Sequence, residues 1–285
     1  MGVCRPYRAA NPDMFLKRAA VTLILLPIGL AVIAWGGWLY YGLIVLILGL
    51  AAYEYGKLFQ AGGLQPAGVF IIVATLVLAV QRAISGFDNA HLTISLLILL
   101  AMAYHLLQYE RGSQQAGTDF AVTLSGFLYI GWLGAYLISL RQLPDGRWWL
   151  LTVLLAVWLA DTGAYLIGSR FGRHKITPRL SPKKSWEGYL GGILCSVPIT
   201  ALLATLWPVW AGPGLAVTPL RAALLALALS VLTILGDLGE SMLKRQVGVK
   251  DSGNLLPGHG GVFDRIDSWL WAAVIGYCLI LWFLK

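Results

Sequence analysis

Charged residues are scarce in this sequence. Only 12% of the 285 residues are Asp, Glu, Lys or Arg, whereas 58% are hydrophobic, and the mean hydropathy is +0.75. Soluble globular domains carry roughly 25% charged residues, so the composition excludes that class. It also excludes a disordered chain. The apolarity argues against a nucleic-acid-binding protein in spite of a net charge of +8. The class that remains is a polytopic membrane protein.

Cysteine is rare as well, and several catalytic motifs are missing. The three cysteines, Cys4, Cys195 and Cys278, are widely separated and form no C-x-x-C pair. This pattern argues against a disulfide framework and against a thiol-ligated metal. No G-x-x-x-x-G-K-[ST] occurs, so the chain is not a P-loop enzyme. The lack of H-E-x-x-H and G-x-S-x-G weakens intramembrane proteolysis and acyl transfer.

Long apolar runs dominate what is present. A membrane-spanning helix needs about 20 mostly apolar residues. The runs do not alternate with polar residues, which excludes a β-barrel and leaves helices, since backbone in lipid must be hydrogen-bonded. The sequence therefore predicts an all-α, polytopic integral membrane protein with about nine transmembrane helices. They are expected at 17–35, 37–54, 67–84, 90–107, 119–140, 148–168, 188–207, 217–240 and 268–284.

The distribution of Lys and Arg predicts the orientation. Sixteen of the 21 fall on the side of the N-terminus and five on the other, so we expect a cytoplasmic N-terminus and a C-terminus on the opposite side. Two polar loops, 169–187 and 241–267, then lie in the cytosol. We expect residues 1–140 to form the N-terminal transmembrane part, with about five spans, and residues 141–285 to form the catalytic part.

Two aspartates interrupt the apolar runs. Asp161 lies about eight residues, or ~12 Å, inside the cytoplasmic end of the sixth span. A carboxylate at that depth costs at least ~2.5–3.5 kcal/mol unless it is paired or coordinated. Asp237 lies one to two turns from the cytoplasmic end of the eighth span and shares a helix face with Ser241 and Lys244. Two acids at similar depth indicate a polar cavity below the cytosolic loops.

The polar residues of the chain are densest in the loop 241–267. Asp264 and Asp267 are three residues apart where the last span begins, so one helical turn can aim both at the same point. Glycines flank His259, which allows the backbone to approach a ligand closely. We leave open whether His259 binds phosphate or only belongs to a turn. Hard oxygen ligands without a Cys or His cluster suit Mg²⁺ rather than zinc.

The loop 169–187 is strongly basic, with six Lys or Arg residues among its interleaved Pro, Ser and Thr residues. Basic loops also determine topology and bind anionic headgroups, but a triphosphate with about four negative charges would use such a loop well. Acids suited to Mg²⁺ and a cationic loop beside a cavity indicate phosphoryl or nucleotidyl transfer. The reactants would be a soluble polyphosphate and a lipid phosphate.

The stretch from Ser241 to Asp267 resembles the signature of phosphatidate cytidylyltransferases (CDP-diacylglycerol synthases). That signature reads S-x-[apolar]-K-R, four residues, K-D, and later H-G-G-x-x-D-R-x-D, and this chain fills every position. The runs S-P-K-K-S-W-E-G at 181–188 and D-T-G-A-Y at 161–165 are also similar to the family. The motifs cover about the last 130 residues, whereas the first four or five spans resemble the family only in being apolar membrane spans.

The resemblance implies transfer of a cytidylyl group from CTP to phosphatidate, giving CDP-diacylglycerol and pyrophosphate in phospholipid biosynthesis. It implies Mg²⁺, held first by Asp237 and Asp264 with Asp161 and Asp267 as additional or outer ligands, and a monovalent cation such as K⁺. The catalytic residues are then Asp161, Asp237, Lys244, Asp264, Arg265 and Asp267. Residues expected to bind substrate are Lys175, Arg179, Ser181, Lys183, Lys184, Ser185, Ser241, Arg245, Lys250, Asp251, His259, Gly260 and Gly261.

By the same resemblance we expect a homodimer. The charge distribution predicts an active site that faces the cytoplasm from a bacterial-type inner or plasma membrane, and the composition predicts no nucleic-acid partner. Two alternatives stay open at this point. A CTP-dependent polyprenol or dolichol kinase would have similar loops but transfer the γ-phosphate. An anion or proton-coupled transporter would use Asp161 and Asp237 as coupling sites. A CDP-alcohol phosphotransferase is disfavoured, because D-G-x-x-A-R is absent at Asp145.

Overall fold

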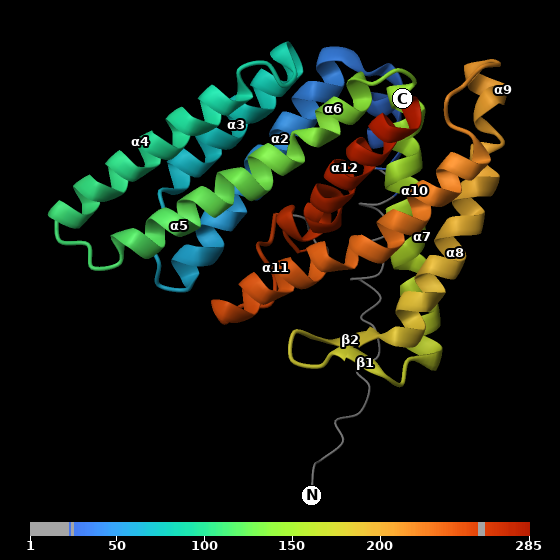
Figure 1. The fold of residues 1–285 in the computed structure, drawn as a ribbon. Helices are drawn as coiled ribbons and strands as arrows, with labels where there is room; N and C mark the ends of the chain where they lie inside the picture. The colour runs from blue at the N-terminus through green and yellow to red at the C-terminus, as the bar shows by residue number, and fades with distance from the viewer. Residues whose placement is uncertain (1–22, 24–25, 256–259) are drawn as a thin grey trace, which may run out of the picture.

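The computed structural model describes residue 23 and residues 26–255 and 260–285. Its helices are α2 (Gly37–Ala61), α3 (Gly68–Ser85), α4 (Ala90–Glu110), α5 (Ala116–Gly126), the π-helix η1 (Phe127–Trp132), α6 (Tyr136–Gln142), α7 (Gly146–Phe171), α8 (Trp186–Ala204), α9 (Trp207–Ala211), α10 (Pro219–Leu232), α11 (Ile234–Gln246) and α12 (Phe263–Leu284). Two strands, β1 (Lys175–Thr177) and β2 (Ser181–Ser185), complete it (Figure 1).

Within the described residues, eight helical segments are long and apolar enough to cross a membrane. They run through 37–61, 68–85, 90–110, 116–142, 146–171, 186–211, 219–246 and 263–284. Each corresponds to one of the expected runs, so the polytopic helical class is confirmed. The first expected span, 17–35, falls partly outside the described residues, and its described part is the shorter apolar helix Leu26–Trp35.

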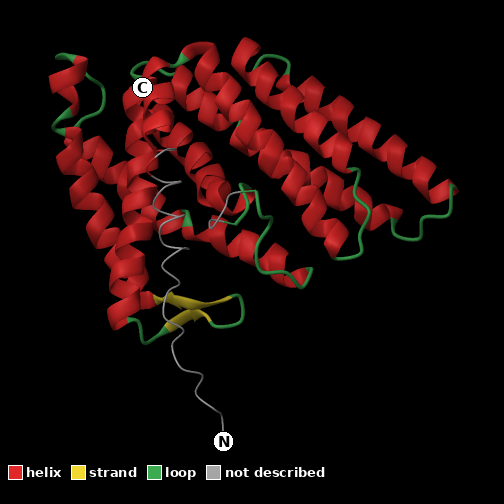
Figure 2. Ribbon diagram, turned by 180° about the vertical axis from the view of Figure 1, so that it is seen from behind, coloured by secondary structure: helices red, strands yellow, loops and turns green. Residues whose placement is uncertain are grey.

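The connection 169–187 contains the two-stranded sheet, which the sequence pattern did not predict. β1 and β2 pair antiparallel, with Lys175 opposite Ser185 and Thr177 opposite Ser181. Figure 2 shows this hairpin at one end of the helix bundle, whereas α9 and the C-terminus lie at the other end (Figure 1). The expected basic loop is therefore a short, ordered projection from the ends of α7 and α8 rather than an irregular segment.

The expected boundaries of the loop 241–267 were wrong. α11 continues to Gln246 and α12 already begins at Phe263, so the connection spans only 247–262. Hydropathy falls at Ser241, but the segment that follows is rich in strong helix formers such as Met, Leu, Lys, Arg and Gln, and the helix propagates through them. At the other end, Asp264 and Asp267 stand in the first two turns of α12, as their spacing indicated.

Small residues bring α7 and α8 close together beside Asp161. A Cβ atom added to Gly188 would lie 2.8 Å from the carbonyl oxygen of Ala164, and one added to Gly192 would lie 2.6 Å from that of Ala160. Such contacts leave no room for a larger side chain, and glycine permits close helix packing of this kind in membranes. The helix pair therefore forms one tight wall of the region that contains Asp161.

The last helix joins the two halves of the chain. α12 contacts α2 and α6 from the first half as well as α7, α10 and α11 from the second. A continuous hydrophobic core includes Tyr40 and Leu48 from α2 together with Trp149 and Leu270 from α7 and α12. The first turn of α12 thus lies where helices from both halves meet.

Candidate active site

Two cavities meet at Asp161 and Asp237. The larger, about 610 Å³, lies between α7, α8, α10 and the hairpin. The smaller, about 420 Å³, lies between α7, α11 and the start of α12. Both volumes are typical of small-molecule sites. Because Asp161 and Asp237 line both cavities, a group bound in one would lie beside a group bound in the other.

The walls of the two cavities differ in chemistry. The larger cavity is lined by lysines of the hairpin, including Lys183 and Lys184, and by Tyr165, Tyr189 and Ile193 of the membrane helices. The smaller cavity carries a dense set of ionisable side chains beside two tryptophans. These side chains are Asp161, Asp237, Glu240, Lys244, Asp251, Asp264, Arg265 and Asp267. One cavity is therefore amphipathic, and the other is mainly ionic.

Three carboxylates are called the cavity acids here: Asp161 and Asp237, which line both cavities, and Asp267, which lines the smaller cavity beside them. Each lies within electrostatic range of the others, and Lys184 acts on all three as the nearby positive charge. Lys184 Nζ is 2.5 Å from an Asp237 carboxylate oxygen. The three carboxylates repel one another, and Asp267 Oδ1 accepts a hydrogen bond from the N–H of Ser268 at 2.6 Å. A cluster of acids of this kind is electrostatically suited to binding cations.

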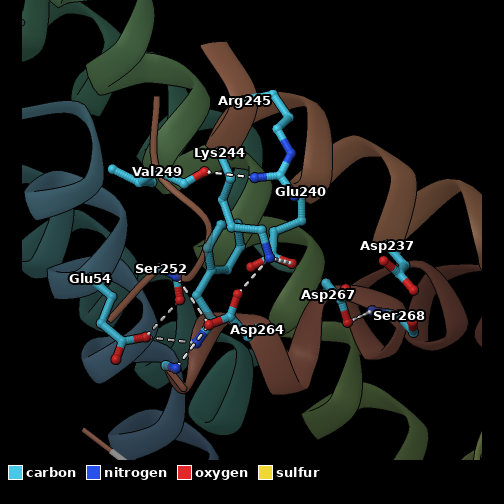
Figure 3. Close-up of polar contacts among 12 residues, drawn as sticks. Glu54, Asp237, Glu240, Lys244, Arg245, Val249, Ser252, Asp264, Asp267 and Ser268 are labelled. Atoms are coloured by element: carbon cyan, nitrogen blue, oxygen red, sulfur yellow. Dashed lines mark hydrogen bonds and ion pairs between the residues drawn. The ribbon is translucent and has the colours of Figure 1, made fainter. Parts of the chain in front are cut away.

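A second group of acids, next to the first turn of α12, has a very different environment (Figure 3). Lys244 Nζ lies 2.9 Å from Glu240 Oε2 and 2.6 Å from Asp264 Oδ1. Asp264 Oδ2 accepts hydrogen bonds from the backbone N–H of Ser252, at 3.0 Å, and of Gly261, at 2.8 Å. We call Glu54, Glu240, Lys244, Ser252 and Asp264 the paired cluster.

Helix periodicity explains how α11 serves both groups. Asp237, Glu240 and Lys244 are separated by three and four residues, so they follow one face of the helix. Asp237 then reaches the junction of the cavities, whereas Glu240 and Lys244, one and two turns later, reach Asp264. The expected common face of Asp237 and Lys244 is thus observed, and both line the smaller cavity.

The structure brings together much of the expected site. Asp161, Asp237, Lys244, Asp251, Asp264, Arg265 and Asp267 line the smaller cavity, and Lys175, Ser181, Lys183, Lys184 and Ser185 line the larger. Among the other described residues of that expectation, Arg179, Ser241, Arg245, Lys250, Gly260 and Gly261 line neither cavity. His259 lies outside the described residues.

Several of these residues have local structural contacts. Ser185 is the N-cap of α8, where its hydroxyl accepts a hydrogen bond from the N–H of Gly188 at 3.2 Å. Arg245 donates to the carbonyl oxygen of Val249 at 3.1 Å. Gly260 has a positive φ of 83°, a conformation that glycine adopts without strain. Capping and turn formation thus account for the contacts of these three residues.

Among the described residues around the site, two buried acids escaped the sequence reasoning. Glu240 is 1% exposed and pairs with Lys244, and Glu54 of α2 is 2% exposed. Glu54 Oε2 accepts a hydrogen bond from the backbone N–H of Phe263 at 2.8 Å. A signal existed in both cases, because each glutamate sits at the end of an apolar run where an unpaired charge would be costly. The identity of the partner of Glu54, 209 positions away, was not readable from the sequence.

The fit of the site to Mg²⁺ rests on its donor chemistry. The cavity acids offer hard carboxylate oxygens with excess negative charge, as Mg²⁺ prefers. Among the described residues, no three Asp, Glu, His or Cys side chains stand close enough together to hold a metal ion as a group. Both oxygens of Asp264 already accept bonds from neighbouring residues, so Asp161, Asp237 and Asp267 are the better candidates. Because these three do not form a ready-made group of ligands, a bound Mg²⁺ would take only part of its coordination from them and the rest from water and substrate phosphates, as is usual for this ion.

Comparison with known proteins bears on this arrangement. The sequence model of a family described as the cytidylyltransferase family matches residues 16–283, and so covers both halves and both cavities. The chain belongs to the cytidylyltransferase family. Its resemblance to phosphatidate cytidylyltransferases is therefore confirmed, and the chain is that of an enzyme, a nucleotidyltransferase.

Individual relatives of the cytidylyltransferase family match over most of the chain. A protein of Pseudomonas aeruginosa named phosphatidate cytidylyltransferase is 36% identical over 280 residues, covering 94% of this chain and 97% of its own. One of the same name from Synechocystis sp. is 32% identical over 296 residues, covering 93% and 96%. A third, from Staphylococcus haemolyticus, is 37% identical over 209 residues, covering 71% and 75%.

Proposed function

We propose that this protein transfers the cytidylyl group of CTP to phosphatidate, giving CDP-diacylglycerol and pyrophosphate. The observation that carries the proposal is the pair of cavities that meet at the cavity acids in a chain of the cytidylyltransferase family. A reaction between a lipid phosphate and a soluble triphosphate needs two such compartments with one common wall. The names of the relatives support this choice of substrates.

The chemistry of the walls supports one assignment of the substrates. Phosphatidate enters from the bilayer, so its headgroup suits the larger cavity, where Tyr165, Tyr189 and Ile193 belong to membrane helices and the lysines face a phosphate. CTP suits the smaller, ionic cavity, where Trp158 and Trp269 offer aromatic surface for a base. Each substrate then brings one phosphate to the wall formed by Asp161 and Asp237.

The reaction needs no covalent enzyme intermediate. The phosphate of phosphatidate is already an anionic nucleophile. One of its oxygens forms a bond to the α-phosphorus of CTP, and the bond from that phosphorus to the bridging oxygen of the β-phosphate breaks. The electron pair leaves with pyrophosphate. Catalysis therefore depends mainly on alignment of the two phosphates and on neutralisation of their mutual repulsion.

The residues of the junction are suited to these two tasks. Lys184, between Asp237 and the larger cavity, provides positive charge beside the reacting phosphates. Asp161, Asp237 and Asp267 would contribute to holding Mg²⁺ together with the substrate phosphates, and the ion supplies charge neutralisation at the phosphate oxygens when bound. The paired cluster holds the first turn of α12 and thereby the position of Asp267. Arg265 lines the smaller cavity and adds a cation where the triphosphate would lie.

The proposal includes four further properties: the side of the membrane on which the site opens, the type of membrane, a homodimer and a monovalent cation. The excess of Lys and Arg near the hairpin supports a site that opens to the cytoplasm of an inner or plasma membrane. A homodimer and a monovalent cation such as K⁺ follow from the family resemblance. Protease protection of the hairpin in oriented vesicles tests the sidedness, and light scattering of the detergent-purified protein tests the dimer.

The central test is pyrophosphate release by the purified full-length protein in detergent with phosphatidate, CTP and Mg²⁺. We expect release that requires both substrates, with ATP, GTP and UTP as much poorer donors. An absence of pyrophosphate above background would refute the proposal. Because detergent solution has no ion gradient, turnover there also excludes a transport function.

A labelling experiment separates nucleotidyl transfer from lipid phosphorylation. With CTP labelled at the α-phosphate, the label should move into the lipid product. With CTP labelled at the γ-phosphate, it should appear in pyrophosphate and stay out of the lipid. The reverse pattern would identify a CTP-dependent lipid kinase, because such an enzyme transfers the terminal phosphate.

A further inference from the structure

The first turn of α12 begins without a cap from its own sequence. The residue at the N-cap, Val262, has helical backbone angles and offers no side-chain acceptor. The first N–H groups of a helix have no partner within that helix. Here the carboxylate of Glu54 provides one, because its Oε2 accepts from the N–H of Phe263 at 2.8 Å. A helix near the start of the chain thus caps a helix near its end.

The same carboxylate also holds the connection that leads into α12. The hydroxyl of Ser252 lies 3.3 Å from Glu54 Oε2, and the N–H of Ser252 donates to Asp264. Asp264 in turn accepts from Gly261 and from Lys244. Figure 3 shows this continuous network from Glu54 to Glu240. Both ends of the connection, at Ser252 and at Gly261, are therefore tied to carboxylates.

The packing around Glu54 is closely fitted to this side chain. A Cβ atom added to Gly253 or to Gly261 would overlap its carboxylate oxygens. Both positions must therefore stay as small as glycine while Glu54 occupies this space. The glutamate itself is 2% exposed, so it has no route to solvent that would satisfy it in another way. A carboxylate so enclosed has a defined position, and a negative charge there also favours the N-terminus of a helix.

We propose that Glu54 is a positioning residue for cytidylyl transfer, acting from the N-terminal half of the chain on the first turn of α12. This proposal rests on the proposed function. Glu54 lines neither cavity, and its contacts reach the site through Phe263, Ser252 and Asp264. What it positions is the helix start that carries Asp264 and Asp267, both of which line the smaller cavity.

The test uses full-length variants in detergent, with kcat and KM measured separately for CTP and phosphatidate. Misplacement of reacting groups by about 1 Å costs on the order of 100-fold in rate. We therefore expect Glu54→Ala to lower kcat by about 30- to 100-fold, with both KM values changing much less. Glu54→Gln keeps an oxygen acceptor of the same reach and should retain most of the kcat. Glu54→Asp, shorter by one methylene group, should resemble Glu54→Ala.

Two controls separate positioning from loss of stability. Leu48→Ala removes a fully buried side chain from the same helix, so it lowers the melting temperature but should leave the kcat of the folded enzyme unchanged. Glu110→Ala removes an exposed glutamate of α4 and should change neither quantity. If Glu54→Ala cannot be purified, two other variants replace it in the same test. Gly253→Ala places a methyl group against the Glu54 carboxylate, and Ser252→Ala removes one of its hydrogen-bond donors.

A second readout does not depend on turnover. In Glu54→Ala, amide hydrogen exchange should accelerate at Ser252, Gly261 and Phe263, while the interior of α7 stays protected. The proposal is overturned if folded Glu54→Ala keeps its kcat within about threefold of the wild type, or if Glu54→Gln loses as much as Glu54→Ala. If wild-type protein releases no pyrophosphate, the proposed function fails, whereas the exchange experiment still tests whether Glu54 anchors α12.

Discussion

The cavity acids and the paired cluster both take residues from α11 and α12 but differ in what their oxygens contact. In the paired cluster, Asp264 accepts from one lysine and two backbone N–H groups. Asp161, Asp237 and Asp267 instead share Lys184, and Asp267 accepts in addition one backbone N–H, that of Ser268. The same residue type therefore serves two purposes, since a satisfied carboxylate stiffens the structure and an under-neutralised one can bind a cation.

This comparison makes different predictions for substitutions in the two groups. Removal of a cavity acid should destroy activity and leave the fold intact. Removal of a charge from the paired cluster should destabilise the fold, because it leaves other buried charges without a partner. Of the five experiments that follow, the first three test this distinction, and the last two test the assignment of the substrates to the cavities and the role of Ser185.

The largest effect is expected for Asp237→Asn. Loss of one group that stabilises charge at the reacting phosphates lowers kcat by about 100- to 1,000-fold. For Asp237→Asn we expect a decrease of about 1,000-fold or more. The melting temperature should change little, because the lost pair with Lys184 is partly exposed and such pairs contribute about 0–1 kcal/mol. Asp88→Asn, at an exposed position, is the matched control. Near-normal turnover in Asp237→Asn would remove Asp237 from the catalytic machinery.

The second prediction concerns Lys244→Met in the paired cluster. Lys244 is 9% exposed, and its substitution leaves Glu240 and Asp264 without their common cation. Loss of one partner from a buried ion pair costs about 3–5 kcal/mol, so thermal or denaturant unfolding should occur much earlier. The adjacent Arg245→Met, at an exposed position, should cost well below 1 kcal/mol by comparison, roughly as for other surface charges. Equal stability of the two variants would contradict the contrast between the groups.

Magnesium removal is the third test. Mg²⁺ that binds only the folded protein stabilises it by about 2.7 kcal/mol at a concentration 100 times its Kd. We expect Mg²⁺ to raise the melting temperature of the wild type and EDTA to reverse this shift. The shift should vanish in Asp161→Asn, Asp237→Asn and Asp267→Asn but survive in Asp88→Asn. A shift of normal size in all three variants would show that the cavity acids do not hold the ion.

A smaller effect is expected from Ile193→Trp, which fills part of the larger cavity. Loss of a few favourable contacts is worth about 1–3 kcal/mol, so KM for phosphatidate should rise by about 10-fold or more while KM for CTP stays unchanged. The neighbouring Leu194→Trp faces away, at a position that is 72% exposed, and should be neutral. A rise in KM for CTP alone would reverse our assignment of the two substrates.

The smallest effect belongs to Ser185→Ala. Its hydroxyl caps α8, and loss of an N-cap costs about 1 kcal/mol. We expect a small decrease in the free energy of unfolding and KM values close to those of the wild type. Thr218→Ala removes the N-cap of α10 far from the site, and we expect it to lower the free energy of unfolding by a similar amount and to leave the KM values unchanged. A large change in KM for Ser185→Ala alone would instead support its expected role in substrate binding.

Hydropathy and charge predicted much of this molecule, because both are local properties of the chain. The spans, the intramembrane Asp161 and Asp237, and the acids at the start of the last helix were all readable in this way. Helix ends were less accurate, as α11 shows, since helix propensity carries a helix past the point where hydropathy falls. The hairpin was missed because short strands of Lys, Ser and Pro have no hydrophobic period.

The sequence by itself determined the class of protein and the position of the eight spans found in the described residues, because composition and periodicity do not depend on distant contacts. It also predicted which residues carry chemistry. Only the tertiary structure decided which carboxylates are satisfied and which face the cavities. Asp264 and Asp267 are three residues apart on one helix and line the same cavity, yet Asp264 pairs with Lys244 and two backbone N–H groups, whereas Asp267 lies beside Asp161 and Asp237 and accepts one backbone N–H. Likewise, Glu54 reaches the site only because folding brings α2 against α12. The environment of a buried charge depends on its neighbours in space, which the order of residues alone does not reveal.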